Sequence, residues 1–173
     1  MSKTFDLPEA DWVVIGVVGE PGRRTFYLQA GQGSIAVTLK VEKAQVGAIA
    51  GFIADMLADL PEEAGTRAGA SVGGDLREPV EASWTVGAIQ LRYDNVADRV
   101  IIHAEELVAE IEGEAPSDDA GTARIGLSRS QARSFVEVGS TLVSSGRAIC
   151  PLCGRPMNLE GHSCPRTNGH HSA

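Results

Sequence analysis

The chain ends in a cysteine-rich tail, which limits its fold and function more than any other part of the sequence. All three cysteines, Cys150, Cys153 and Cys164, lie within fifteen residues and share that stretch with His162. The Cys-x-x-Cys spacing of the first pair places two thiolates on one tight turn. His162 and Cys164 are two residues apart, so they point the same way in an extended segment. Because zinc prefers four such ligands in a tetrahedron, the tail is predicted to be a small Cys3His zinc knuckle.

Other interpretations of the cysteines are less favoured. A redox-active Cys-x-x-Cys pair usually opens a helix, whereas Gly154 and Pro156 follow this one. A disulfide would leave one thiol unpaired, and no export signal indicates an oxidising compartment. A catalytic zinc needs an open coordination position, but four ligands from one short tail would close the site. Zinc is therefore the predicted cofactor, with no catalytic or organic-cofactor-binding residue assigned. The fourth ligand is open, because His170 or His171 could replace His162.

The rest of the chain has the size of one folded domain. With 173 residues, 43% of them hydrophobic, the chain suits a domain of about 100–150 residues and an appendage. We expect a body over residues 1–146, with residues 1–11 as a polar lead-in, and a zinc-binding tail over 147–173. The sequence shows neither a leader peptide nor a run of about eighteen apolar residues, so we expect a cytoplasmic protein with no membrane contact.

Charge differs between the two parts. Residues 1–145 contain 12 Lys/Arg and 22 Asp/Glu, a net charge of −10, whereas residues 146–173 contain three arginines and one glutamate, a net charge of +2. An acidic body disfavours general nucleic-acid binding, which depends on Lys and Arg contacts to phosphates. The tail arginines Arg147, Arg155 and Arg166 nevertheless keep a local nucleic-acid contact as an alternative.

Hydrophobic periodicity predicts strands followed by a helix, twice. β-rich runs cover residues 12–18, 24–30 and 34–41, and later residues 84–93, 99–104 and 122–127. Residues 61–82 are rich in glycine and without an apolar period, so we expect a mobile loop there. A helix over 42–60 is predicted by apolar residues at three- and four-residue steps: Ile49, Phe52, Ile53, Met56, Leu57 and Leu60. A second helix is predicted to follow Ser128, whose spacing from Gln131 suits a capping box. Its apolar stripe is Ala132, Phe135, Val136, Gly139, Leu142 and Val143.

The two strand-to-helix junctions align when the sequence is shifted by 86 residues, which places Lys43 on Arg129 and Gln45 on Gln131. Any two strand-to-helix junctions would align in part by chance. The basic-x-Gln positions that both junctions share favour a duplication. We therefore predict an α+β fold: an antiparallel β-rich body of two similar strands-then-helix halves, with an internal repeat over about 12–60 and 84–145.

Polar residues of the body form no recognised catalytic set. Asp94, Asp98 and His103 are close in sequence, as in some hydrolases, but turn and surface positions explain them more simply. Arg23 and Arg24 follow a Gly-Glu-Pro-Gly turn that could cradle an anion, yet the strand–loop–helix context of a phosphate loop is missing. Whether the chain is an enzyme is not decided by the sequence, which favours a non-enzymatic role.

Three stretches of the sequence are distinctive together: Gly19-Glu-Pro-Gly-Arg-Arg-Thr-Phe-Tyr-Leu-Gln-Ala30, Glu42-Lys-x-Gln45, and Cys150-Pro-Leu-Cys-Gly with His162-x-Cys-Pro-Arg-x-Asn-Gly169. In these stretches the chain resembles an uncharacterised actinobacterial family that carries a domain-of-unknown-function label. The resemblance covers nearly the whole chain. It implies a cytoplasmic actinobacterial protein with gene neighbours that resemble a histidine phosphatase and a lipid-kinase-like protein, and it implies no reaction.

These observations favour a protein-interaction or adaptor module with an unidentified protein partner. The first alternative is an enzyme or regulator that acts on a phosphorylated small molecule through Arg23, Arg24 and His103. The second alternative is a nucleic-acid binder that uses the basic tail. The oligomeric state is not predicted.

Overall fold

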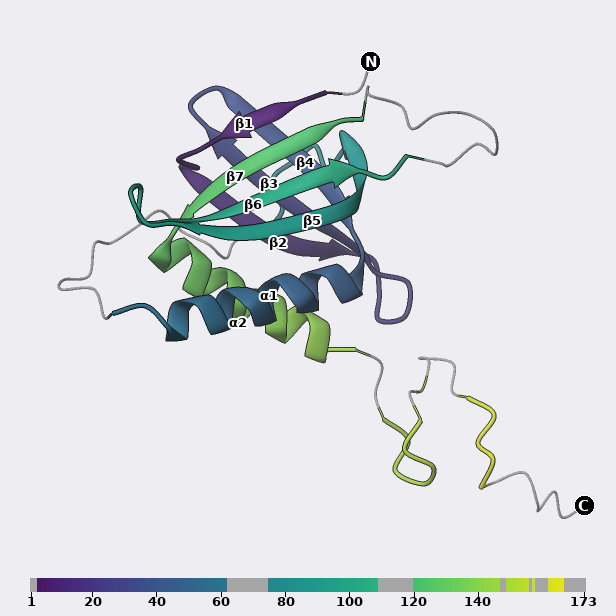
Figure 1. Cartoon of the computed structure of the whole chain (residues 1–173). Helices are drawn as coiled ribbons and strands as arrows, with labels where there is room; N and C mark the ends of the chain where they lie inside the picture. The colour runs from purple at the N-terminus through teal and green to yellow at the C-terminus, as the bar shows by residue number, and fades with distance from the viewer. Residues whose placement is uncertain are drawn as a thin grey trace, which may run out of the picture.

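The protein is described by a computed structural model that covers residues 3–61, 75–108, 120–146, 149–155, 157 and 162–166. These residues form one mixed sheet of seven strands and two helices that pack on one face of the sheet (Figure 1). The sequence order of the elements is β1 (Phe5–Leu7), β2 (Trp12–Val18), β3 (Thr25–Gln32), β4 (Ile35–Val41), α1 (Lys43–Ala58), β5 (Trp84–Asp94), β6 (Arg99–Glu106), β7 (Thr122–Ser128) and α2 (Arg129–Ser144). The predicted α+β class is confirmed, and neither helix in this part of the chain is long and apolar enough to cross a bilayer.

The sheet consists of two antiparallel meanders that lie side by side. β2, β3 and β4 form the first meander, which α1 follows, and β5, β6 and β7 form the second, which α2 follows. The meanders join where β4 and β5 pair in parallel, with Leu39 opposite Trp84. The prediction of two strands-then-helix halves is therefore confirmed.

The N-terminal segment forms both edge strands of the sheet and connects them. β1 pairs in parallel with β7 at one edge, and β2 forms the other edge. Between them, the N–H of Ala10 donates to the carbonyl of Gly126 at 3.0 Å and the N–H of Asp11 donates to that of Gly31 at 2.8 Å. The backbone passes so close to β7 that a Cβ at position 126 would lie 1.9 Å from the carbonyl oxygen of Pro8. The expected polar lead-in is therefore a structural part of the sheet, because its strand β1 pairs with the edge of β7.

Both helices begin with the same glutamine arrangement. The side-chain oxygens of Gln45 and Gln131 each accept a hydrogen bond at 2.8 Å, from the N–H groups of Glu42 and Ser128 respectively. The Nε2 of Gln45 donates to the carbonyl of Gly87 in β5 at 3.1 Å. The Nε2 of Gln131 donates to the carbonyl of Ala10, just before β2, at 2.9 Å. The capping box predicted for α2 is confirmed, and each amide also fixes its helix to the other half.

The core lies between the helices and the sheet. The stripe predicted for α2 faces this core, with Ala132 and Phe135 fully buried. For α1 the prediction was wrong at one position, because Phe52 is 62% exposed. The buried face of α1 follows Val46, Ile49, Ala50 and Ile53. Phe52 precedes Ile53 by one residue and lies about 100° around the helix from it, at the margin of the buried face.

Part of the expected 61–82 loop lies against the sheet. Residues 62–74 are outside the described residues, but the backbone of Arg77 pairs with the side chain of Gln29 in β3. The N–H of Arg77 donates to Oε1 of Gln29 at 2.8 Å, and Nε2 of Gln29 donates to the Arg77 carbonyl at 2.9 Å. The guanidinium of Arg77 also lies 3.8 Å from the ring centre of Trp12. The Gln29 amide thus pairs with the backbone of Arg77 as a neighbouring strand would. Hydrophobic periodicity in the sequence gives no sign of this pairing.

Candidate metal centre

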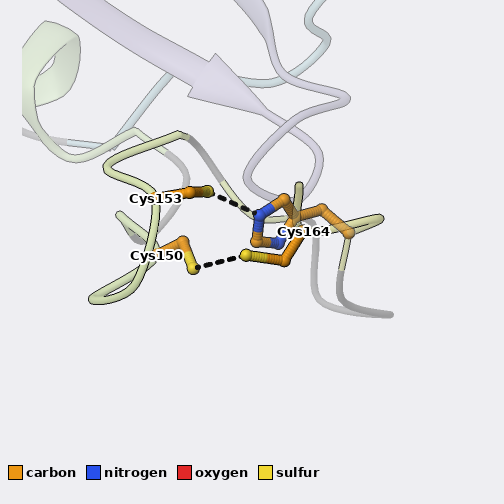
Figure 2. Close-up of side chains that lie close together, drawn as sticks. Cys150, Cys153 and Cys164 are labelled. Carbon is orange, nitrogen blue, oxygen red and sulfur yellow. Dashed lines mark hydrogen bonds between the residues drawn. The ribbon is translucent and has the colours of Figure 1, made fainter. Parts of the chain in front are cut away.

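The four predicted tail ligands come together. The sulfur atoms of Cys150, Cys153 and Cys164 and a ring nitrogen of His162 all lie within 4.8 Å of one another. The Sγ atoms of Cys150 and Cys164 are 3.9 Å apart, and Sγ of Cys153 lies 3.1 Å from Nε2 of His162 (Figure 2). Two sulfurs bound to one tetrahedral zinc would be about 3.8 Å apart. The cluster could therefore bind a metal ion.

A tight turn aims the first two sulfurs at the cluster. The N–H of Gly154 donates to the carbonyl of Cys150 at 2.9 Å, and the N–H of Cys150 donates to the carbonyl of Arg155 at 2.9 Å. Gly154 has a φ of +71°, a conformation in which a Cβ would be strained. Cys150 and Cys153 are thereby held on one turn, as the Cys-x-x-Cys spacing predicts.

The second ligand pair lies on a separate segment that contacts this turn. Nη1 of Arg166 donates to the carbonyl of Leu152, between the two cysteines, at 3.1 Å. This bond holds residues 162–166 against the turn, so that His162 and Cys164 face the first two ligands. Arg166, considered above as a nucleic-acid contact, thus has a role within the tail.

Burial of the thiols favours their joint interaction with a cation. Cys150 and Cys164 are only 4% and 6% exposed, and none of the three cysteines forms a disulfide. Desolvation raises the pKa of the Cys153 thiol, the N–H of Arg155 opposes this rise, and contacts with the other two thiols add to it. Several thiolates in one such cluster would repel each other, and a metal ion among them would offset both the repulsion and the desolvation.

The body residues considered for an anion site are not brought together. Nη1 of Arg24 donates to the carbonyl oxygen of Ser145 at 2.7 Å and to its hydroxyl at 3.1 Å, next to the C-terminal end of α2. The hollow beside Arg24 is also lined by Lys43 and does not include His103. His103 lies on β6, where Nδ1 is 3.7 Å from the carboxylate of Glu105.

The acidic residues near the β5–β6 turn have structural partners. Asp94 accepts hydrogen bonds at 3.0 Å from the N–H groups of Val96 and Ala97. Asp98 accepts one from the hydroxyl of Tyr93 and another from Nε of Arg129 at 2.7 Å. These two partners hold the pKa of Asp98 below its usual value, against a smaller opposing effect of burial. Asp98 is therefore ionised at neutral pH and joins the hairpin to the start of α2.

A seven-stranded mixed sheet with two helices and a C-terminal Cys/His cluster defines an α+β protein with a candidate metal site. The chain belongs to the family described as "Protein of unknown function (DUF3090)", whose model matches residues 4–164. The match extends from β1 to the last cluster residue. No curated protein and no solved structure matched the chain. The resemblance to a family of unknown function is thus confirmed, whereas the actinobacterial origin stays a prediction.

Two alternatives for the fourth ligand fall outside these observations. His170 and His171 lie beyond both the matched region and the described residues. Within the described tail, His162 supplies the ring nitrogen of the cluster. Two apolar side chains beside the cluster, Ile149 and Leu152, were not predicted to be functional; they are 61% and 52% exposed. Their positions in the sequence, each directly before a cysteine, could have indicated that they lie beside the cluster.

Proposed function

We propose that this chain is a cytoplasmic, non-enzymatic interaction module in which zinc folds the tail into a surface that binds a partner protein. The observation that carries the proposal is the convergence of Cys150, Cys153, His162 and Cys164 within 4.8 Å. Thiolate and imidazole ligands favour zinc over magnesium or calcium, which prefer oxygen. Four protein ligands would fill a tetrahedral site and leave no position for substrate, which favours a structural ion.

The surface of the proposed zinc knuckle supports a role in binding. Leu152 lies between the two cysteines of the turn, and its side chain is 52% exposed. Nearby, Ile149 is 61% exposed. So small a unit does not bury these two apolar side chains itself. A partner protein could bury both of them in one interface.

The alternative functions have less support. A site for a phosphorylated small molecule would need Arg24, which already bonds Ser145, and His103, which is not part of the same hollow. A nucleic-acid surface would need free tail arginines, but Arg166 bonds the carbonyl of Leu152. The net charge of −8 also opposes binding to phosphates.

We also propose that the two halves form an internal repeat. The proposal is supported by Gln45 and Gln131, which occupy the same helix position and make equivalent bonds to the backbone near the first strand of the other half. If one strands-then-helix unit was duplicated, the two copies would form one sheet with both helices packed on it. The same glutamine of each copy would then bond the other copy.

Leu152→Asp is expected to abolish partner binding without loss of zinc, because the change adds a charge to the proposed interface and leaves all four ligands in place. The test is affinity purification of the tagged full chain from its native host, with quantitative mass spectrometry and elemental analysis of the same samples. The matched control is Val96→Asp, since Val96 is also apolar and is 98% exposed at the β5–β6 turn. Proteins recovered equally by both variants and the wild type would contradict the proposed binding surface.

A further inference from the structure

A second surface of the body lies between α1 and β5, which contact each other and are both labelled in Figure 1. Here an apolar groove of about 420 Å³ is open to solvent. Its walls include Ala48, Phe52 and Met56 from α1, and Gly87, Ile89 and Leu91 from β5. Phe52 is 62% exposed, so the described residues cover only part of this large aromatic side chain.

Among the described residues, the side chains that line the groove offer few free polar groups. Among the described residues of the lining, Gln45 has the one strongly polar side chain, and both ends of that amide are already bonded. Its Oε1 accepts from the N–H of Glu42, and its Nε2 donates to the carbonyls of Val86 and Gly87. These side chains therefore suit an apolar surface. Directed hydrogen bonds would have to come from the backbone of β5, which pairs with β4 only at Trp84 and Thr85.

The border of the groove on α1 is acidic. Asp55 and Asp59 are exposed and follow Phe52 by three and seven residues, so they lie on the same side of the helix. The C-terminal end of α1 adds negative partial charge there. The single basic residue of α1 is Lys43, which lines the separate hollow beside Arg24 and Gly146. An occupant with positive charges beside its apolar surface would therefore match this border.

We propose that the groove binds an amphipathic helix of a partner protein, about three turns long, with Lys or Arg residues beside its apolar face. The α1 part of the wall runs from Gln45 to Met56, about 17 Å of helix, which matches such a segment. A second copy of the chain fits less well. The apolar faces of α1 and α2 are already buried in the core, and a net charge of −8 opposes self-association.

The test is a display selection of helical peptides against the full chain. The library carries fixed apolar residues at i, i+4 and i+7 and random residues elsewhere, and the enriched peptides are afterwards measured against the Phe52→Asp variant. We expect the enriched peptides to be basic and to bind Phe52→Asp at least about tenfold more weakly than the wild type, a loss of roughly 1.4 kcal/mol. The double variant Asp55→Asn/Asp59→Asn should bind several-fold more weakly at low salt, with a smaller difference at high salt.

Two controls make the outcome specific. Ile35→Asp changes another apolar residue, 52% exposed at the start of β4, and should bind the peptides as the wild type does. Thermal unfolding of each variant establishes that it is folded. The proposal would be overturned by no enrichment, by acidic or uncharged peptides, by equal binding to Phe52→Asp, or by a wild-type dimer that Phe52→Asp dissociates.

This inference rests on the proposed interaction role but not on the metal. Peptide binding in the groove should persist after chelation and in Leu152→Asp, whereas tail-dependent partners should be lost. Failure of the selection together with partner capture that depends on Leu152 would refute the groove alone. Metal-free protein with intact peptide binding would refute the zinc tail alone.

Discussion

Cys164→Ser is expected to weaken zinc binding more than about 100-fold, since loss of an outer-shell partner alone costs roughly 10–100-fold. Cys164 is 6% exposed and lies 3.9 Å from Cys150, sulfur to sulfur. A hydroxyl is a poor replacement for a thiolate ligand, so the site would keep three protein ligands. Competition with a chromophoric chelator measures the affinity, and amide NMR spectra measure the folding of the tail. We expect tail signals to collapse toward random-coil positions, because metal binding supplies the folding free energy of so short a segment.

The neighbouring residue supplies the control for this experiment. Ser163→Ala changes an exposed side chain between His162 and Cys164 and should leave both affinity and spectra unchanged. His162→Ala should weaken binding, whereas His170→Ala and His171→Ala should not, which separates the candidate fourth ligands. Signals of the sheet and helices should persist in every variant, since the body has its own core. Wild-type affinity in Cys164→Ser would contradict the assignment of this sulfur as a ligand.

Gln131→Leu is expected to lower the free energy of unfolding by about 2–4 kcal/mol, because each buried polar group left without its partner costs roughly 1–3 kcal/mol. Gln131 is 2% exposed. Its amide bonds the N–H of Ser128 at 2.8 Å and the carbonyl of Ala10 at 2.9 Å. Leucine can satisfy neither group. Urea unfolding followed by circular dichroism measures the difference, and the slope of the transition reports whether the native state stays compact.

The equivalent residue of the first half is the comparison. Gln45 makes the same capping bond but is only half-buried, so water can replace more of what Gln45→Leu removes. We expect a loss of about 1 kcal/mol there, the usual net value of a hydrogen bond. A Gln131→Leu protein as stable as Gln45→Leu would show that the contact with Ala10 contributes little to the sheet.

Features encoded in local sequence could be predicted. The strand-to-helix order, the capping box at Ser128 and the two close Cys/His pairs of the tail each depend on residues a few positions apart, and the structure contains all three. The prediction for Phe52 was wrong because an apolar residue beside a buried stripe has the same period as one within it. Only the packing of α1 against the sheet decides which side is buried.

Features that depend on distant residues could not be predicted. β1 has three residues, too few for a periodic signal, and it exists because β7 offers a parallel partner 118 positions away at Arg124, opposite Asp6. The pairing of Gln29 with the backbone of Arg77 likewise joins residues 48 positions apart. The groove beside Phe52 arises from the relative position of α1 and β5, for which no residue pattern is diagnostic.

We propose that one zinc ion binds the three sulfurs and one imidazole of the tail and so forms its interaction surface. The most direct test of this proposal is elemental analysis of the full chain, expressed without added metal and purified under reducing conditions. We expect about one zinc per chain, because the four proposed ligands would make one tetrahedral site. Reduced, folded protein that contains no zinc and takes up none on addition would contradict the proposal.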